Sequence, residues 1–102
     1  MSRERALQTL SRVFEPETQV SITRLGQLDS LEVSEDGSVE VIFHPMSPYT
    51  PLVLVAKLAL DIASALRSLE GVTAFKVNVS GHPLSDYLNR SLDKVLRAHE
   101  TK

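Results

Sequence analysis

The chain has 102 residues, which is typical of one domain with one hydrophobic core. Its formal net charge is −2, and its eleven basic and thirteen acidic residues are scattered, which disfavours a nucleic-acid binder because such proteins carry a basic face. Cysteine is absent, so the chain alone can form no disulfide, thiolate nucleophile or thiolate metal site.

The first predicted elements are a helix and a connection. Apolar residues recur at helical spacing over residues 2–14, which indicates an amphipathic helix that Pro16 ends. Residues 17–26 are less regular, and we expect an extended or turn-like connection that ends at Gly26.

A β-hairpin is predicted next. Apolar and polar residues alternate over 31–33 and again over 39–43, which is typical of half-buried strands. Between them, Asp36 and Gly37 form a pair that favours a tight turn, since glycine accepts the positive φ that such turns need.

A proline-rich loop over 44–51 then leads into a long helix that runs to Leu69. Thr50 is a candidate N-cap and Pro51 fits the first helical position. This helix is apolar on more than one face, so we expect a second layer or a partner subunit, including a second copy in a homodimer, to cover the additional surface.

The last predicted elements are a strand over 73–80, a turn over 81–83, and a second amphipathic helix over 85–98. Ser85 is the expected cap of this helix. Its expected apolar stripe consists of Leu84, Leu88, Leu92, Val95 and Leu96.

The predicted fold is an α/β domain of the two-layer α+β type, in the order α-β-β-α-β-α, with helices packed on a small three-stranded mixed sheet. The helix between the second and third strands forms a β-α-β crossover, so these two strands should be parallel and end at the same edge. Ligand sites favour such an edge. The candidate binding residues expected there are Arg24, His44, Ser47, Tyr49, Thr50 and His82.

These residues suggest three kinds of site. Arg24 beside the helix N-terminus at Thr50 would suit a phosphate or carboxylate. His44 and His82 lack the spacing and the acidic neighbours of a metal site, so we predict no metal and no cofactor. Ser47 near either histidine has no nucleophile-elbow motif around it, so we predict no catalytic residue and no hydrolase activity.

Four stretches together resemble the iron–sulfur assembly domain family, also catalogued as domain of unknown function 59, which includes SufT- and PaaD-type proteins. The segment 14–17 is similar to the family's Asp-Pro-Glu, and 22–26 to its Val-Asp-Leu-Gly. The segment 47–52 is similar to its Thr-Pro-Gly-Cys-Pro-Leu, and 69–72 to its Leu-Pro-Gly-Val. The chain is identified as a divergent member, since Thr50 stands where the family has cysteine and Arg24 where it has aspartate.

The resemblance implies an α/β domain that assists the maturation of iron–sulfur proteins through contacts with scaffold or target proteins. Without the cysteine, it implies a non-enzymatic adapter that holds no cluster of its own. The alternative is an anion or small-metabolite binding domain that uses Arg24 and the helix N-terminus at Thr50.

The sequence predicts neither a signal peptide nor a membrane span. Residues 1–12 are charged and amphipathic, and the apolar stretch 51–60 is interrupted by Lys57 and too short to cross a bilayer. We therefore expect a single cytoplasmic domain over residues 1–102.

Overall fold

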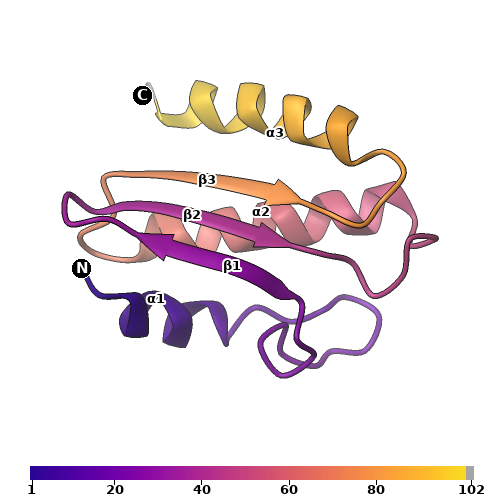
Figure 1. Ribbon diagram of the computed structural model, residues 1–102, viewed down its shortest axis with the longest axis horizontal. Helices are drawn as coiled ribbons and strands as arrows, with labels where there is room; N and C mark the ends of the chain where they lie inside the picture. The colour runs from indigo at the N-terminus through magenta and orange to yellow at the C-terminus, as the bar shows by residue number, and fades with distance from the viewer. Residues whose placement is uncertain (101–102) are drawn as a thin grey trace.

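In the computed structural model, which describes residues 1–100, the elements follow one another in the predicted order (Figure 1). They are α1 (Arg3–Leu10), β1 (Leu28–Val33), β2 (Ser38–Phe43), α2 (Leu52–Ser68), β3 (Ala74–Val79) and α3 (Ser85–Glu100).

The strands form one mixed sheet in the order β1-β2-β3, which confirms the predicted α+β fold. β1 is antiparallel to β2, with Leu31 opposite Val41, and β2 is parallel to β3, with Val41 opposite Val77. The turn between β1 and β2 contains Gly37 with φ of 93°, as the Asp-Gly pair predicted. Because β2 and β3 are parallel, both end at the same edge of the sheet.

The core lies between α2 and one face of the sheet. In Figure 1, α2 runs behind the strands, while α1 lies beside β1 and α3 beside β3. One stripe of α2 is buried, as its helical spacing predicted, and burying each large aliphatic side chain contributes roughly 1.5–3 kcal/mol. The stripe packs with strand residues that alternate along β2 and β3. These buried residues are Val55, Leu58, Ala59, Ile62, Ala63 and Leu66 from α2, with Val39, Val41, Phe43, Val77 and Val79 from the sheet.

The outer edge of β3 is protected by α3. The side-chain amide of Asn89 donates to the Val79 carbonyl at 3.0 Å, and its oxygen accepts from the Val79 N–H at 2.8 Å. These two bonds satisfy backbone groups that would otherwise be free to pair with another strand. α3 therefore closes this edge as well as adding Leu88, Leu92 and Leu96 to the core.

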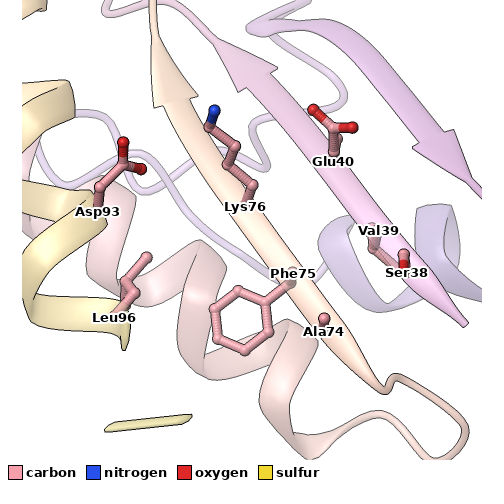
Figure 2. Close-up of a pocket in the computed structure, with 8 residues that line it drawn as sticks. All are labelled: Ser38, Val39, Glu40, Ala74, Phe75, Lys76, Asp93 and Leu96. Carbon is pink, nitrogen blue, oxygen red and sulfur yellow. The ribbon is translucent and has the colours of Figure 1, made fainter. Parts of the chain in front are cut away.

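The second face of the sheet carries exposed residues such as Glu40 and Lys76. Between this face and α3 lies a groove of about 350 Å³, to which Asp93 and Leu96 contribute from the helix (Figure 2). Its strand residues include Ser38 and Ala74, the first residues of β2 and β3. The groove is thus near the amino ends of the strands, away from the edge where the sequence predicted a site.

The first helix is shorter than predicted. α1 ends at Leu10, whereas its pattern suggested a helix to residue 14. The backbone of Val13 instead accepts from the Ile22 N–H at 3.0 Å, and Glu15 donates to the Val20 carbonyl at 2.9 Å. A proline disfavours helical dihedrals at the residue before it, which here is Glu15. The chain therefore turns back at this point, and Phe14 is left half exposed.

The predicted N-cap of α2 was wrong. The N-cap is Pro51, which makes no side-chain capping bond, and not Thr50. The Thr50 hydroxyl oxygen accepts from the Ser47 N–H at 3.3 Å, so it belongs to the preceding turn. The helix begins at Leu52, one position later than the proline pattern suggested.

Two expectations for α3 were also wrong. Ser85 is the first helical residue and its hydroxyl accepts from the His82 N–H at 3.1 Å, so it is not the N-cap. Leu84 and Val95, which were expected in the buried stripe, are both exposed. Because α3 packs on the edge of β3, only one narrow face of this helix is buried. That face is narrower than the spacing of the apolar residues in α3 implies.

Candidate functional site

Three chain segments meet where β2 and β3 end and β1 begins, at the edge that the sequence favoured for a site. The N–H of His44, just after β2, donates to the Gln27 carbonyl at 2.9 Å. The N–H of Ser80, just after β3, donates to the Phe43 carbonyl at 2.8 Å. These backbone bonds bring side chains from three separate segments together.

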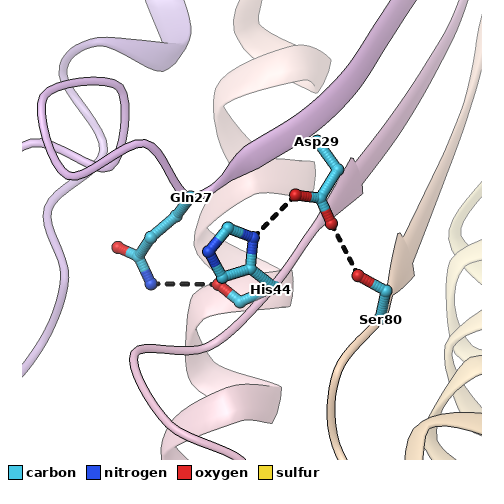
Figure 3. Close-up of polar contacts among 4 residues, drawn as sticks. All are labelled: Gln27, Asp29, His44 and Ser80. Atoms are coloured by element: carbon cyan, nitrogen blue, oxygen red, sulfur yellow. Dashed lines mark hydrogen bonds and ion pairs between the residues drawn. The ribbon is translucent and has the colours of Figure 1, made fainter.

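Asp29 is the centre of the polar cluster at this edge (Figure 3). It lies at a β-bulge in β1, where the register with β2 shifts between Leu28 and Ser30. One carboxylate oxygen lies 2.7 Å from Nδ1 of His44, and the other accepts from the Ser80 hydroxyl at 2.6 Å. A single carboxylate therefore ties together residues next to all three strands.

The order of these three side chains does not match a hydrolytic triad. In a triad the imidazole lies between the carboxylate and the hydroxyl, so that it can take the hydroxyl proton. Here Asp29 lies between Ser80 and His44. The Ser80 hydrogen bond, assisted by the charge and hydrogen bond of His44 and opposed by partial burial, lowers the pKa of Asp29. A carboxylate with a lowered pKa is a weaker base than an ordinary one.

Gln27 is a buried residue that bonds to the segment after β2. Its side chain is only 1% exposed, and its amide nitrogen donates to the His44 carbonyl at 3.1 Å. Its Oε1 atom is buried and accepts no hydrogen bond from the described residues. Together with the His44 N–H bond to the Gln27 carbonyl, this contact fixes the chain as it leaves β2.

The lowered pKa of Asp29 predicts a pH-dependent contribution to stability. Its pKa is lower in the folded state than the unfolded value near 4, so the contribution is present above about pH 4 and is lost as pH falls through the folded pKa. Asp29→Asn should therefore lose less free energy of unfolding than the wild type between pH 5 and pH 2. Urea unfolding at several pH values measures this difference, and parallel pH curves for the two proteins would contradict it.

His82 joins the two loops that follow β2 and β3. Its Nδ1 atom accepts from the Leu84 N–H at 3.0 Å, so this nitrogen carries no hydrogen. Its Nε2 atom lies 2.9 Å from the Thr50 carbonyl, which can only accept, so the ring carries its hydrogen on Nε2. His82 is thus a structural link between the start of α2 and the start of α3.

Side chains near this link form an exposed, largely apolar surface. Tyr49 is 89% exposed, and its backbone is held by a bond from its N–H to the Ser47 hydroxyl at 3.0 Å. Tyr49 precedes Thr50, and Leu84 lies two residues after His82, so both loops present side chains close to the link. We define the loop-end surface as Met46, Tyr49, Val53, Leu84 and Tyr87, all of which are exposed.

The six predicted site residues do not form one cluster. The structure links His82 to Thr50, and Ser47 to both Tyr49 and Thr50. His44 has a separate set of partners. Within residues 1–100, the exposed Arg24 side chain makes no hydrogen bond or ion pair, so nothing joins it to Thr50.

Three residues of the site escaped the sequence analysis: Gln27, Asp29 and Ser80. The sequence suggested that the histidines lack acidic neighbours, whereas Asp29 contacts His44 directly. The sequence does carry a signal here, because Leu28 and Leu31 are separated by two polar residues, Asp29 and Ser30, where strict alternation has one. This break in the alternation coincides with the bulge, at which the register with β2 shifts between Leu28 and Ser30.

Within residues 1–100, no group of three or more histidine, cysteine, aspartate or glutamate side chains is arranged so that it could hold a metal ion. Among these residues, no helix combines the length and apolar character that a bilayer crossing requires.

Comparison with known proteins gives two matches. The family model described as iron–sulfur cluster assembly protein matches residues 3–79, which include α1, the whole sheet and α2. The chain is also 32% identical over 92 residues to the uncharacterized protein MJ1129 of Methanocaldococcus jannaschii. That alignment covers 90% of this chain and 95% of the relative.

Proposed function

Because the chain belongs to the iron–sulfur cluster assembly protein family, we propose that it acts in cluster assembly as a non-enzymatic cytoplasmic adapter that contacts other proteins of this process. The cluster, or its iron, is then cargo or product of the partners and is not held by this chain alone.

The loop-end surface is the observation that carries this proposal. Exposed apolar side chains gathered on one part of a small protein are typical of protein–protein contacts, and tyrosine is enriched at the centres of such contacts. Two loops and the first turns of α2 and α3 supply these residues, and the His82 bond to Thr50 holds the two loops together. A partner would therefore meet a surface that is already formed, which lowers the entropic cost of association.

The chemistry of the neighbouring residues also supports an adapter. Thr50 is 9% exposed and stands where the family has cysteine, and a neutral hydroxyl is a poor ligand for the thiolate-preferring iron of a cluster. The Ser80 hydroxyl donates to a carboxylate of lowered pKa, so neither group is prepared for acid–base or nucleophilic catalysis.

The anion-binding alternative has less support among residues 1–100. It requires a guanidinium beside the first turn of α2, and no contact among these residues holds the Arg24 side chain there. The N-cap of this helix is Pro51, whose side chain offers no donor to an anion. We therefore propose the adapter function in preference to anion binding.

Combined replacement of Tyr49 and Leu84 by alanine should weaken partner binding at least tenfold, since losing two central apolar contacts commonly costs more than 1.4 kcal/mol. The measurement is biolayer interferometry against purified iron–sulfur scaffold and carrier proteins of the same organism. The melting temperature should stay within about 2 °C, because both side chains are exposed.

A matched control replaces Leu60 and Val95 by alanine. Both are exposed apolar residues on α2 and α3 but lie outside the loop-end surface. This control should keep wild-type affinity. If wild-type protein binds none of the scaffold or carrier proteins, or if anaerobic incubation with iron and sulfide loads one isolated chain with a stoichiometric cluster, the adapter proposal is wrong.

A further inference from the structure

A second surface involves none of the residues of the Asp29 cluster. One cavity of about 440 Å³ lies between α2 and residues 12–19, which follow α1, and another of about 380 Å³ lies between α1 and the end of α2. Arg12 lines both of them. We call them together the seam groove and define it by Arg5, Arg12, Phe14, Lys57, Asp61 and Glu70.

The seam groove is long and has two different halves. Its α2 lining extends from Lys57 to Ser68, which is about 16 Å at the helical rise per residue. An extended peptide of about five residues has this length. The half around Phe14 is mainly apolar, with Val13 and Ala65 beside it, whereas the half around Arg5 is mainly polar.

The net charge of the residues that line the groove is positive, whereas the net charge of the whole chain is negative. Three basic side chains line it against two acidic ones, although the chain carries a net charge of −2. Asp61 is already paired with Lys57 at 2.6 Å. The guanidinium groups of Arg5 and Arg12 donate to no acceptor within residues 1–100, so they are available to carboxylates of a ligand.

The wall that carries Phe14 is held rigidly. The buried Glu15 carboxylate accepts from the N–H groups of Glu17 at 3.0 Å and Thr18 at 2.6 Å, which closes the turn after Phe14. The Ser21 hydroxyl donates to the Ser11 carbonyl at 2.7 Å, and Phe14 pairs with Ser21 in an isolated bridge. An apolar side chain held half exposed on a fixed wall is suited to receive an apolar anchor.

We propose that the seam groove binds a short, extended acidic peptide segment of a partner protein. Its carboxylates pair with Arg5 and Arg12, and one apolar side chain packs against Phe14. This would give the adapter a second docking surface, which involves none of the residues of the loop-end surface.

The groove fits a peptide better than a phosphate backbone. About half of it is apolar, and Asp61 and Glu70 would repel a continuous row of phosphates. A peptide can place carboxylates only where the arginines lie and can place an apolar side chain elsewhere. A small metabolite would fill only one of the two cavities.

The test uses fluorescence anisotropy with three labelled peptides and one labelled hexanucleotide. The first peptide has a central phenylalanine with two glutamates on one side and two glycines on the other. The second has lysines in place of the glutamates, and the third has glycine in place of the phenylalanine. Only the first should bind with saturation, and its affinity should fall as salt concentration rises. Equal or tighter binding of the lysine peptide or the hexanucleotide would overturn the proposal, as would no binding of the first peptide.

Variants locate the site. Arg12→Glu should weaken the first peptide about tenfold, because it replaces attraction by repulsion at the middle of the groove. Arg24→Glu is the matched control, since it makes the same charge change at an exposed position outside the groove, and it should leave the affinity unchanged. Phe14→Ala should remove the difference between the phenylalanine and glycine peptides. An equal loss in Arg12→Glu and Arg24→Glu would mean unspecific charge attraction and would overturn the site.

Discussion

Replacing Gly37 with alanine should lower the free energy of unfolding by about 2–5 kcal/mol. Gly37 has φ of 93°, where a side chain is strained, and a Cβ atom there would lie 2.2 Å from the Gly71 carbonyl oxygen. The turn cannot easily move aside, because the Thr73 N–H donates to the Gly37 carbonyl at 3.0 Å and the Thr73 hydroxyl donates to the Asp36 carbonyl at 2.9 Å.

Gly26→Ala separates the two causes of this loss. Gly26 also has a positive φ, of 70°, but a Cβ atom there would meet nothing within 4 Å. Its replacement should cost only the backbone term, about 1–2 kcal/mol. Urea unfolding or calorimetry measures both variants, and 1 kcal/mol corresponds to a shift of about 4–8 °C in melting temperature for a domain of this size. Equal losses would show that the contact with Gly71 has no effect.

The strands and their connections were predictable because their signals are local. Alternation identifies β2, and the Asp36-Gly37 pair identifies the turn before it. The crossover through α2 then fixes the direction of β3, since a helix of this length returns the chain to the same end of the sheet. The mixed sheet therefore follows from two short patterns and one rule of topology.

Helix ends were predicted less well because competing hydrogen bonds decide them. The apolar pattern of α1 continues through Val13, yet the Val13 carbonyl pairs with Ile22 from a returning segment. Before α2, the Thr50 hydroxyl oxygen could accept from the Ser47 N–H of the turn or from an N–H group in the first turn of the helix. It accepts from Ser47. Nothing in the order of the residues distinguishes these outcomes, because both partners lie within reach.

The meeting of the chain segments was predictable, but the contacts among their side chains were not. The parallel pair β2 and β3 predicts that the segments after them share one edge of the sheet, and His44, Thr50 and His82 do lie there. Which side chain bonds to which depends on a bulge at Asp29, and a one-residue shift in register reverses the direction of a side chain. The sequence therefore pointed toward one cluster where the structure has two.

Thr50, at the position that the sequence resemblance matches to the family's cysteine, has a structural role in this chain. The Thr50 side chain completes a turn with Ser47, and its carbonyl receives the His82 ring. Thr50 is largely buried and is bonded through both its hydroxyl and its carbonyl oxygen, so its side chain belongs to the turn before α2.

Phe43→Ala should be the most destabilising single truncation near the site, with a loss of about 3–5 kcal/mol in the free energy of unfolding. Phe43 is completely buried at the end of β2, and its carbonyl accepts from Ser80. Ile42→Ala is the matched control, because Ile42 lies one residue earlier on the opposite face and is 39% exposed. The control should lose about 1 kcal/mol or less.

A second measurement follows the cluster around Asp29. Small domains are stable by only about 5–15 kcal/mol, so Phe43→Ala should also loosen this cluster. Faster hydrogen exchange at the Ser80 amide would report this loosening. Equal losses for the two variants would mean that the core does not extend beneath this edge of the sheet.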